Sequence, residues 1–192
     1  MGMRHREIQG GVYTGSRVGD LLRGAECRRA VLHALAVGYR QIDTAESYDN
    51  EAEVGRAIRE SPADREDTFL TTKVWFDHLE RGAFLRAVAA GLHRLDTDYV
   101  DLLLIHWPNP DVPLRETLGA ILELKAAHTV RHIGVSNFTP ALVEEALAVT
   151  PIFCNQVECH PYLAQERLRA LATRGSYAHR LLTAGTGPCD GR

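Results

Sequence analysis

The sequence predicts an α/β fold of the (β/α)8 TIM-barrel type, in an incomplete form with about five to six βα units. Strand-like runs alternate with helical patterns of about 10–15 residues, which is typical of βαβ units and a parallel sheet. No Gly-rich phosphate loop follows any strand, which favours a barrel over a doubly wound sheet. Successive strands end in polar residues, and the C-terminal ends of the strands are where such barrels have their active sites.

The predicted elements follow one another in a regular order. Apolar residues such as Val31 and Leu35 recur at helical spacing, and Gly38 ends that first helix. Thr139 is a plausible N-cap before Pro140, which starts a later helix. Helices are predicted over 25–37, 51–59, 79–95, 114–127, 140–149 and 163–173, and strands over 39–42, 68–74, 99–106, 130–137 and 153–158.

Composition excludes several classes of protein. The chain has 192 residues, 45% of them hydrophobic and 24% charged, which is typical of a folded globular domain. A net charge of -3 gives no basic field for a nucleic acid. No apolar run reaches the ~18 residues of a membrane-spanning helix, and no signal-type segment follows the first residues. We therefore expect a cytoplasmic protein without a membrane partner.

The cysteines predict reduced thiols and no metal site. Cys27, Cys154, Cys159 and Cys189 show no CxxC spacing, and two of them lie in or beside an apolar strand pattern.

The two ends of the chain have less regular patterns than the part between them. The first 23 residues hold at best one weak strand, and 175–192 is expected to be a poorly ordered tail, since it shows no periodicity and ends rich in glycine.

Four polar residues lie at or just past the ends of consecutive predicted strands: Asp43, Tyr48, Lys73 and His106. If these strands are neighbours, the four side chains converge. A tyrosine is a poor acid at neutral pH, but a nearby ammonium lowers its pKa, and a histidine can orient a carbonyl oxygen beside it. With Asp43 pairing to Lys73, such a site could donate a proton to a carbonyl. Taken singly, each residue also has a purely structural explanation.

These residues lie in segments that resemble the NADPH-dependent aldo-keto reductase family. The segments are 38–55 (GYRQIDTAESYDNEAEVG), 72–75 (TKVW), 98–108 (DYVDLLLIHWP), 133–138 (IGVSNF) and 155–162 (NQVECHPY). They occur in the family's order and span about residues 24–173. The resemblance implies reduction of aldehydes or ketones to alcohols by a monomeric enzyme that uses NADPH and acts on a small carbonyl substrate. It also implies that 1–174 form a partial reductase barrel.

The resemblance assigns roles to particular residues. It makes Tyr48 the proton donor, with Asp43, Lys73 and His106 completing the catalytic set and Asp43 also contacting the cofactor. It places Ser136, Asn137 and Gln156 against the nicotinamide carboxamide. His106, Trp75 and Trp107 would line the substrate pocket.

Both ends depart from the family pattern. Residues 11–20 do not reproduce the family's first barrel strand, and nothing after 174 matches its seventh and eighth strands or its basic loop for the cofactor phosphate. These departures predict weak NADPH affinity, marginal stability and open edges that could pair or aggregate. An inactive barrel remnant or interaction module is therefore an alternative, and a zinc hydrolase on the same barrel is a third.

Overall fold

A computed structural model describes residues 22–160, 162–173 and 178–182. The weak strand considered within the first 23 residues falls almost wholly outside these ranges. The helices are α2 (Gly24–Ala36), α3 (Glu51–Glu60), α4 (Arg81–Leu95), α5 (Leu114–Ala126), α6 (Pro140–Leu147) and α7 (Glu166–Thr173). The strands are β1 (Gln41–Asp43), β2 (Phe69–Val74), β3 (Val100–Ile105), β4 (Val130–Ser136), β5 (Cys154–Glu158) and β6 (Ala178–Leu182).

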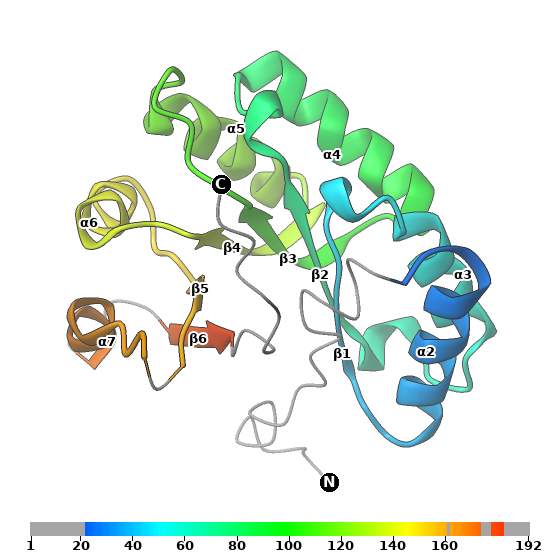
Figure 1. The fold of residues 1–192 in the computed structure, drawn as a ribbon. Coiled ribbons are helices and arrows are strands. Elements are labelled where there is room, and N and C mark those ends of the chain that lie inside the picture. Colours follow the sequence, from blue (N-terminus) through cyan, green and yellow to red (C-terminus); the bar gives the residue numbers. More distant parts are fainter. Residues whose placement is uncertain (1–21, 161, 174–177, 183–192) are drawn as a thin grey trace, which may run out of the picture.

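The strands form one parallel sheet in the order of the chain, from β1 to β6. The sheet curves, and the helices lie around its outer side (Figure 1). A hydrogen bond of 2.8 Å from Gln156 Nε2 on β5 to Asp43 Oδ2 on β1 spans the inside of this curve. These are the features of an incomplete (β/α)8 barrel, as the sequence predicted.

Two hydrophobic layers follow from the alternation of side chains along β3. Leu103 and Ile105 are fully buried in the main core with apolar residues of the helices. Leu102 and Leu104 belong to a second, smaller cluster with Cys154 of β5. The first layer fixes the helices to the sheet, and the second fills part of the barrel interior.

The local signals in the sequence correspond to the structure. Gly38 has φ 100°, a conformation that glycine adopts without strain, and it ends the first helix as predicted. The Thr139 side chain accepts a hydrogen bond from Leu142 N, which confirms the predicted N-cap. Gly55 allows α3 to approach α4 closely, since a Cβ there would lie 2.3 Å from the Leu95 carbonyl oxygen.

Strand β6 differs from the irregular tail expected over 175–192. Its backbone pairs in parallel with β5, with His179 opposite Asn155. The sequence over 178–182 has no alternating pattern, and pairing with a preformed strand overrides such weak local preferences. The rest of that range lies outside the described residues, so the boundary at 174 stays a prediction. None of the described helices is long and apolar enough to cross a membrane.

Candidate active site

Asp43 and Lys73 form an ion pair at the carboxyl ends of β1 and β2. The Lys73 ammonium contacts Asp43 Oδ1 and also donates to the Thr44 carbonyl oxygen at 2.9 Å. The two side chains are 1% and 8% exposed, so the pair is held away from water. The pairing predicted from the sequence is present because two neighbouring parallel strands end side by side.

The environment of Lys73 keeps its amine charged. Burial alone would lower the pKa of the ammonium, but the Asp43 carboxylate and the Tyr48 phenol outweigh that cost, and the Lys73 pKa is raised. A permanent positive charge therefore lies inside the barrel mouth. It is 3.4 Å from the Tyr48 hydroxyl oxygen.

Tyr48 lies at the end of a short 3-10 turn, η2 (Glu46–Tyr48), and is half-buried. The Tyr48 amide donates to the Ala45 carbonyl oxygen at 3.1 Å. The chain then turns through Asp49, whose φ of 53° is left-handed, before α3 begins. The Thr44 hydroxyl donates to the Asn50 side-chain oxygen at 2.6 Å, which ties both ends of this turn together.

Glu51, the first residue of α3, fixes this stretch to the rest of the barrel. It is 2% exposed. One carboxylate oxygen accepts from the Thr72 hydroxyl at 2.6 Å, and the other accepts from Arg94 Nε at 2.8 Å. The sequence motif around Tyr48 thus contains structural anchors as well as candidate catalytic groups.

His106 follows β3 directly and its ring lies beside Tyr48. The two ring centroids are 5.6 Å apart in an edge-to-face arrangement. Burial, and then the Lys73 charge, lower the His106 pKa to about 3 although Asp43 acts in the opposite direction. The imidazole is therefore neutral at physiological pH. The Ser47 hydroxyl oxygen lies 3.3 Å from His106 Nδ1.

Ser136, Asn137 and Gln156 lie together beside this cluster. The Asn137 side-chain amide donates to the His106 carbonyl oxygen at 2.9 Å and to Ser136 Oγ at 3.1 Å. The Ser136 hydroxyl donates to the Gln156 carbonyl oxygen at 2.9 Å. Asn137 has φ 61°, a backbone conformation that asparagine tolerates better than most residues.

Gln156 differs at its two polar atoms. Its Nε2 donates to Asp43 Oδ2, while its Oε1 is buried and has no hydrogen-bond partner among the residues that the structure describes. A buried acceptor without a donor is rare in native structures and calls for an explanation. An amide donor, such as the carboxamide of a nicotinamide ring, fits this atom. The residues present are thus compatible with a nicotinamide cofactor at this position.

The two tryptophans differ in their surroundings. Trp75 lies just after β2, and its ring is edge-on to His106 with centroids 5.1 Å apart. Trp107 follows His106 in the chain and is 47% exposed. The structure therefore brings Trp75 into the cluster, whereas Trp107 is an exposed side chain for which no ring contact with the cluster is seen among the described residues.

Two contacts of Glu46 in this region were not predicted from the sequence. Glu46 Oε2 accepts from the Trp75 amide at 2.9 Å, and Glu46 Oε1 lies 2.8 Å from His78 Nδ1. Glu46 was visible as part of the motif between Asp43 and Tyr48. Nothing in the sequence indicated its partners, because both lie on the segment that follows the next strand.

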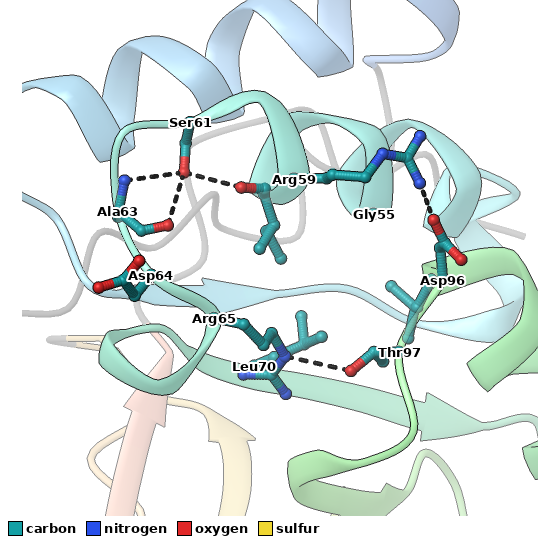
Figure 2. A pocket seen from close by; sticks show the side chains of 11 residues that line it. Gly55, Arg59, Ser61, Ala63, Asp64, Arg65, Leu70, Asp96 and Thr97 are labelled. Carbon is teal, nitrogen blue, oxygen red and sulfur yellow. Dashed lines mark hydrogen bonds and ion pairs between the residues drawn. The ribbon is translucent and has the colours of Figure 1, made fainter.

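A cavity of about 290 Å³ lies away from this cluster, between the ends of α3 and α4 and the loop before β2 (Figure 2). Its arginines are already engaged: Arg59 pairs with Asp96, and Arg65 Nε donates to Thr97 at 3.2 Å. Among the described residues no group of three or more His, Cys, Asp or Glu side chains could hold a metal ion. The cluster around Tyr48 is therefore the candidate active site.

Comparisons with known proteins agree with this geometry. The Aldo/keto reductase family profile matches residues 14–185. Methylglyoxal reductase DkgB of Escherichia coli O157:H7 is 45% identical over an alignment of 148 residues, and the match covers 74% of this chain and 55% of that protein. 2,5-Diketo-D-gluconic acid reductase B of Corynebacterium sp. (strain SHS752001) is 42% identical over 153 residues, 78% of this chain and 55% of its own length.

A solved structure gives the same result. An aldo/keto reductase from Brucella melitensis superposes with a TM-score of 0.74 at 44% identity, covering 79% of this chain and 60% of its own. This chain thus spans little more than half the length of the curated relatives that it matches. The family generally uses NAD(P)H as its reductant. From the matched profile, the identities and the shared fold, the chain belongs to the aldo/keto reductase family.

Proposed function

We propose that this protein reduces small aldehydes or ketones to alcohols with NADPH, and that Tyr48 donates the proton to the carbonyl oxygen. The observation that carries the proposal is the position of the Lys73 ammonium. It lies between the Asp43 carboxylate and the Tyr48 hydroxyl, at 3.4 Å from the latter, in a buried site. A cation at this distance favours the phenolate that forms when the proton leaves.

Each neighbour has a distinct task in this proposal. Asp43 holds Lys73 charged and in place, which its ion pair and the raised Lys73 pKa support. His106 is neutral at physiological pH, with a pKa of about 3, so it orients the carbonyl oxygen through a hydrogen bond and does not compete as the acid. Trp75, edge-on to His106, forms a wall of the substrate pocket. Trp107 borders the same pocket from the exposed side.

The cofactor would be held by residues on three strands or their ends. Gln156 Oε1, for which the described residues supply no donor, would accept from the carboxamide, and Ser136 and Asn137 lie next to it. Asp43 completes this surface through its bond to Gln156. When bound, the reduced nicotinamide supplies a hydride to the carbonyl carbon. Preference for NADPH over NADH is part of the proposal and rests on family resemblance.

The decisive experiment measures NADPH consumption by the purified chain with a panel of carbonyls. Methylglyoxal and a diketo sugar acid come first, because the matched relatives are named for such substrates. Alcohol formation in step with NADPH loss would support the proposal. A folded chain that neither binds NADPH nor reduces any of these carbonyls would instead support an inactive remnant or interaction module.

Tyr48→Phe provides the matched test of mechanism. It removes one hydroxyl and leaves the ring against His106 in place. We expect reduction to fall by about 10²–10⁴-fold, the usual contribution of general acid catalysis, while NADPH affinity measured by calorimetry changes little. A variant that kept more than a tenth of the rate would show that another group supplies the proton.

A further inference from the structure

We infer that Glu46 is a positioning residue that fixes the Trp75 side of the substrate pocket relative to the turn that carries Tyr48. This inference rests on the proposed carbonyl reduction. Glu46 begins η2, the turn that ends at Tyr48. Its carboxylate reaches the next loop, where Trp75 precedes the 3-10 turn η4 (Phe76–His78).

The two oxygens of Glu46 hold two points of that loop. Oε2 accepts from the Trp75 amide at 2.9 Å, and Oε1 lies 2.8 Å from His78 Nδ1. The Glu46 side chain is 19% exposed, and a carboxylate with this little water is held firmly by the donors it has. The carboxylate therefore spans η4 from its start to its end and joins it to η2.

The consequence for the pocket follows from the Trp75 ring. The indole is edge-on to His106 and packs on Phe76 at 5.0 Å between ring centroids. Tyr48 has supports of its own, the Lys73 contact and the bond to the Ala45 carbonyl. Loss of the Glu46 contacts would thus displace Trp75 more than Tyr48. Substrate affinity should therefore fall, while the position of the Tyr48 hydroxyl should stay the same.

Two conservative variants separate the effect of the length of the Glu46 side chain from the effect of its charge. Glu46→Gln keeps an oxygen at the same distance for the Trp75 amide but has no charge. Glu46→Asp keeps the charge, but its side chain is shorter by one carbon–carbon bond of roughly 1.5 Å, which takes both oxygens beyond hydrogen-bond distance. His78→Ala is the matched control, because it removes only the Oε1 contact.

Hydrogen exchange of the Trp75 amide, followed by NMR, tests the contact without any turnover. In Glu46→Asp we expect exchange to rise by about tenfold, the factor that loss of one ordinary hydrogen bond produces. In Glu46→Gln and His78→Ala it should stay within about threefold of the native rate. The His106 amide, which donates to Val74 O, serves as the internal reference.

Kinetics then test the positioning role. Glu46→Asp should raise KM for the carbonyl by about tenfold and change kcat by less than about twofold, and Glu46→Gln should restore KM. Equal damage by Gln and Asp, or unchanged Trp75 exchange in Glu46→Asp, would overturn the inference. If the native chain reduces no carbonyl, the proposed function fails, and the exchange data still decide whether Glu46 holds Trp75.

Discussion

Two buried aspartates lie at opposite ends of the barrel strands and illustrate different uses of the same side chain. Asp43 ends β1 and contacts the Lys73 ammonium and the Gln156 amide. Asp101 lies near the start of β3. It accepts from Arg65 at 3.0 Å, from Arg131 at 2.9 Å and from the Leu70 amide at 2.9 Å.

The partners of the two aspartates differ in what else they contact. Around Asp101, both guanidinium groups lie 4.1 Å from the Tyr99 ring, one from Arg65 and one from Arg131. The Asp101 contacts join β3 to β2, to β4 and to the loop before β2. Around Asp43, the Lys73 ammonium also reaches the half-buried Tyr48 hydroxyl. Incomplete pairing alone does not separate the two ends, because within the described part of the chain both Gln156 Oε1 and the Tyr99 hydroxyl are buried without a hydrogen-bond partner. What differs is that the Asp43 pair also contacts a candidate proton donor, whereas the Asp101 contacts hold strands and loops together.

The largest effect on stability should come from Lys73→Met. Methionine replaces the aliphatic stem of lysine but leaves the buried Asp43 without its cation, which typically costs about 3–5 kcal/mol of unfolding free energy. Carbonyl reduction should be lost as well. Urea denaturation measures the loss, and Lys125→Met, at an exposed lysine, is the control.

Asp101→Ala should have a smaller effect, limited to stability. The Leu70 amide would lose its acceptor, at a cost of about 1–3 kcal/mol, while Arg131 is exposed enough to turn to water. Acid should not restore this loss, because guanidinium groups stay charged. Kinetic constants for reduction should match those of the native chain, and Asp64→Ala, at an exposed aspartate nearby, is the control. Altered kinetics would show that the two ends are coupled.

A pair of histidines compares the two ends in the same way. Burial lowers the pKa of His106 to about 3 at the active-site end, and it lowers the pKa of His132 near the start of β4. Both folded values lie below the unfolded value of about 6.5. The unfolded chain therefore binds protons first, and stability is full above about pH 6.5 and falls as the pH drops.

His106→Gln should remove more of this loss of unfolding free energy at acidic pH than His132→Gln does. Each proton taken up on unfolding contributes about 1.4 kcal/mol per pH unit in the acidic range. Chemical denaturation at several pH values between the folded pKa of His106, about 3, and its unfolded pKa of about 6.5 measures how steeply the unfolding free energy of each variant depends on pH. Equal slopes for both variants would mean that burial at the two ends perturbs the histidines to the same extent.

The sequence allowed the Asp43 and Lys73 pair to be predicted, because neighbouring parallel strands place their ends together. The contact between Gln156 and Asp43 could not be predicted in the same way. Their positions are 113 residues apart, and the contact depends on the curvature of the whole sheet. The contact of Glu46 with the Trp75 amide depends on loop geometry. Strand β6 was missed because its stability comes from pairing with β5 and not from its own pattern.

The smallest expected effect concerns Ser47, whose hydroxyl lies 3.3 Å from His106 Nδ1. A hydroxyl that donates to Nδ1 of a neutral imidazole leaves the proton on Nε2, the tautomer that can donate to a carbonyl oxygen. Ser47→Ala removes one part-buried hydrogen bond, so kcat should fall by about two- to tenfold with little change in the midpoint of unfolding. Ser47→Thr, which keeps the hydroxyl, should restore kcat.

Thr97→Ala is the matched removal of a hydroxyl at the other end, where Thr97 accepts from Arg65 Nε at 3.2 Å. It should lower stability slightly and leave kcat unchanged. If kcat is lowered in both Ser47→Ala and Ser47→Thr, then the size of the side chain, and not its hydroxyl, matters to His106. Only a hydroxyl-specific effect confined to Ser47 would preserve the contrast between an end that orients reacting groups and an end that holds the strands together.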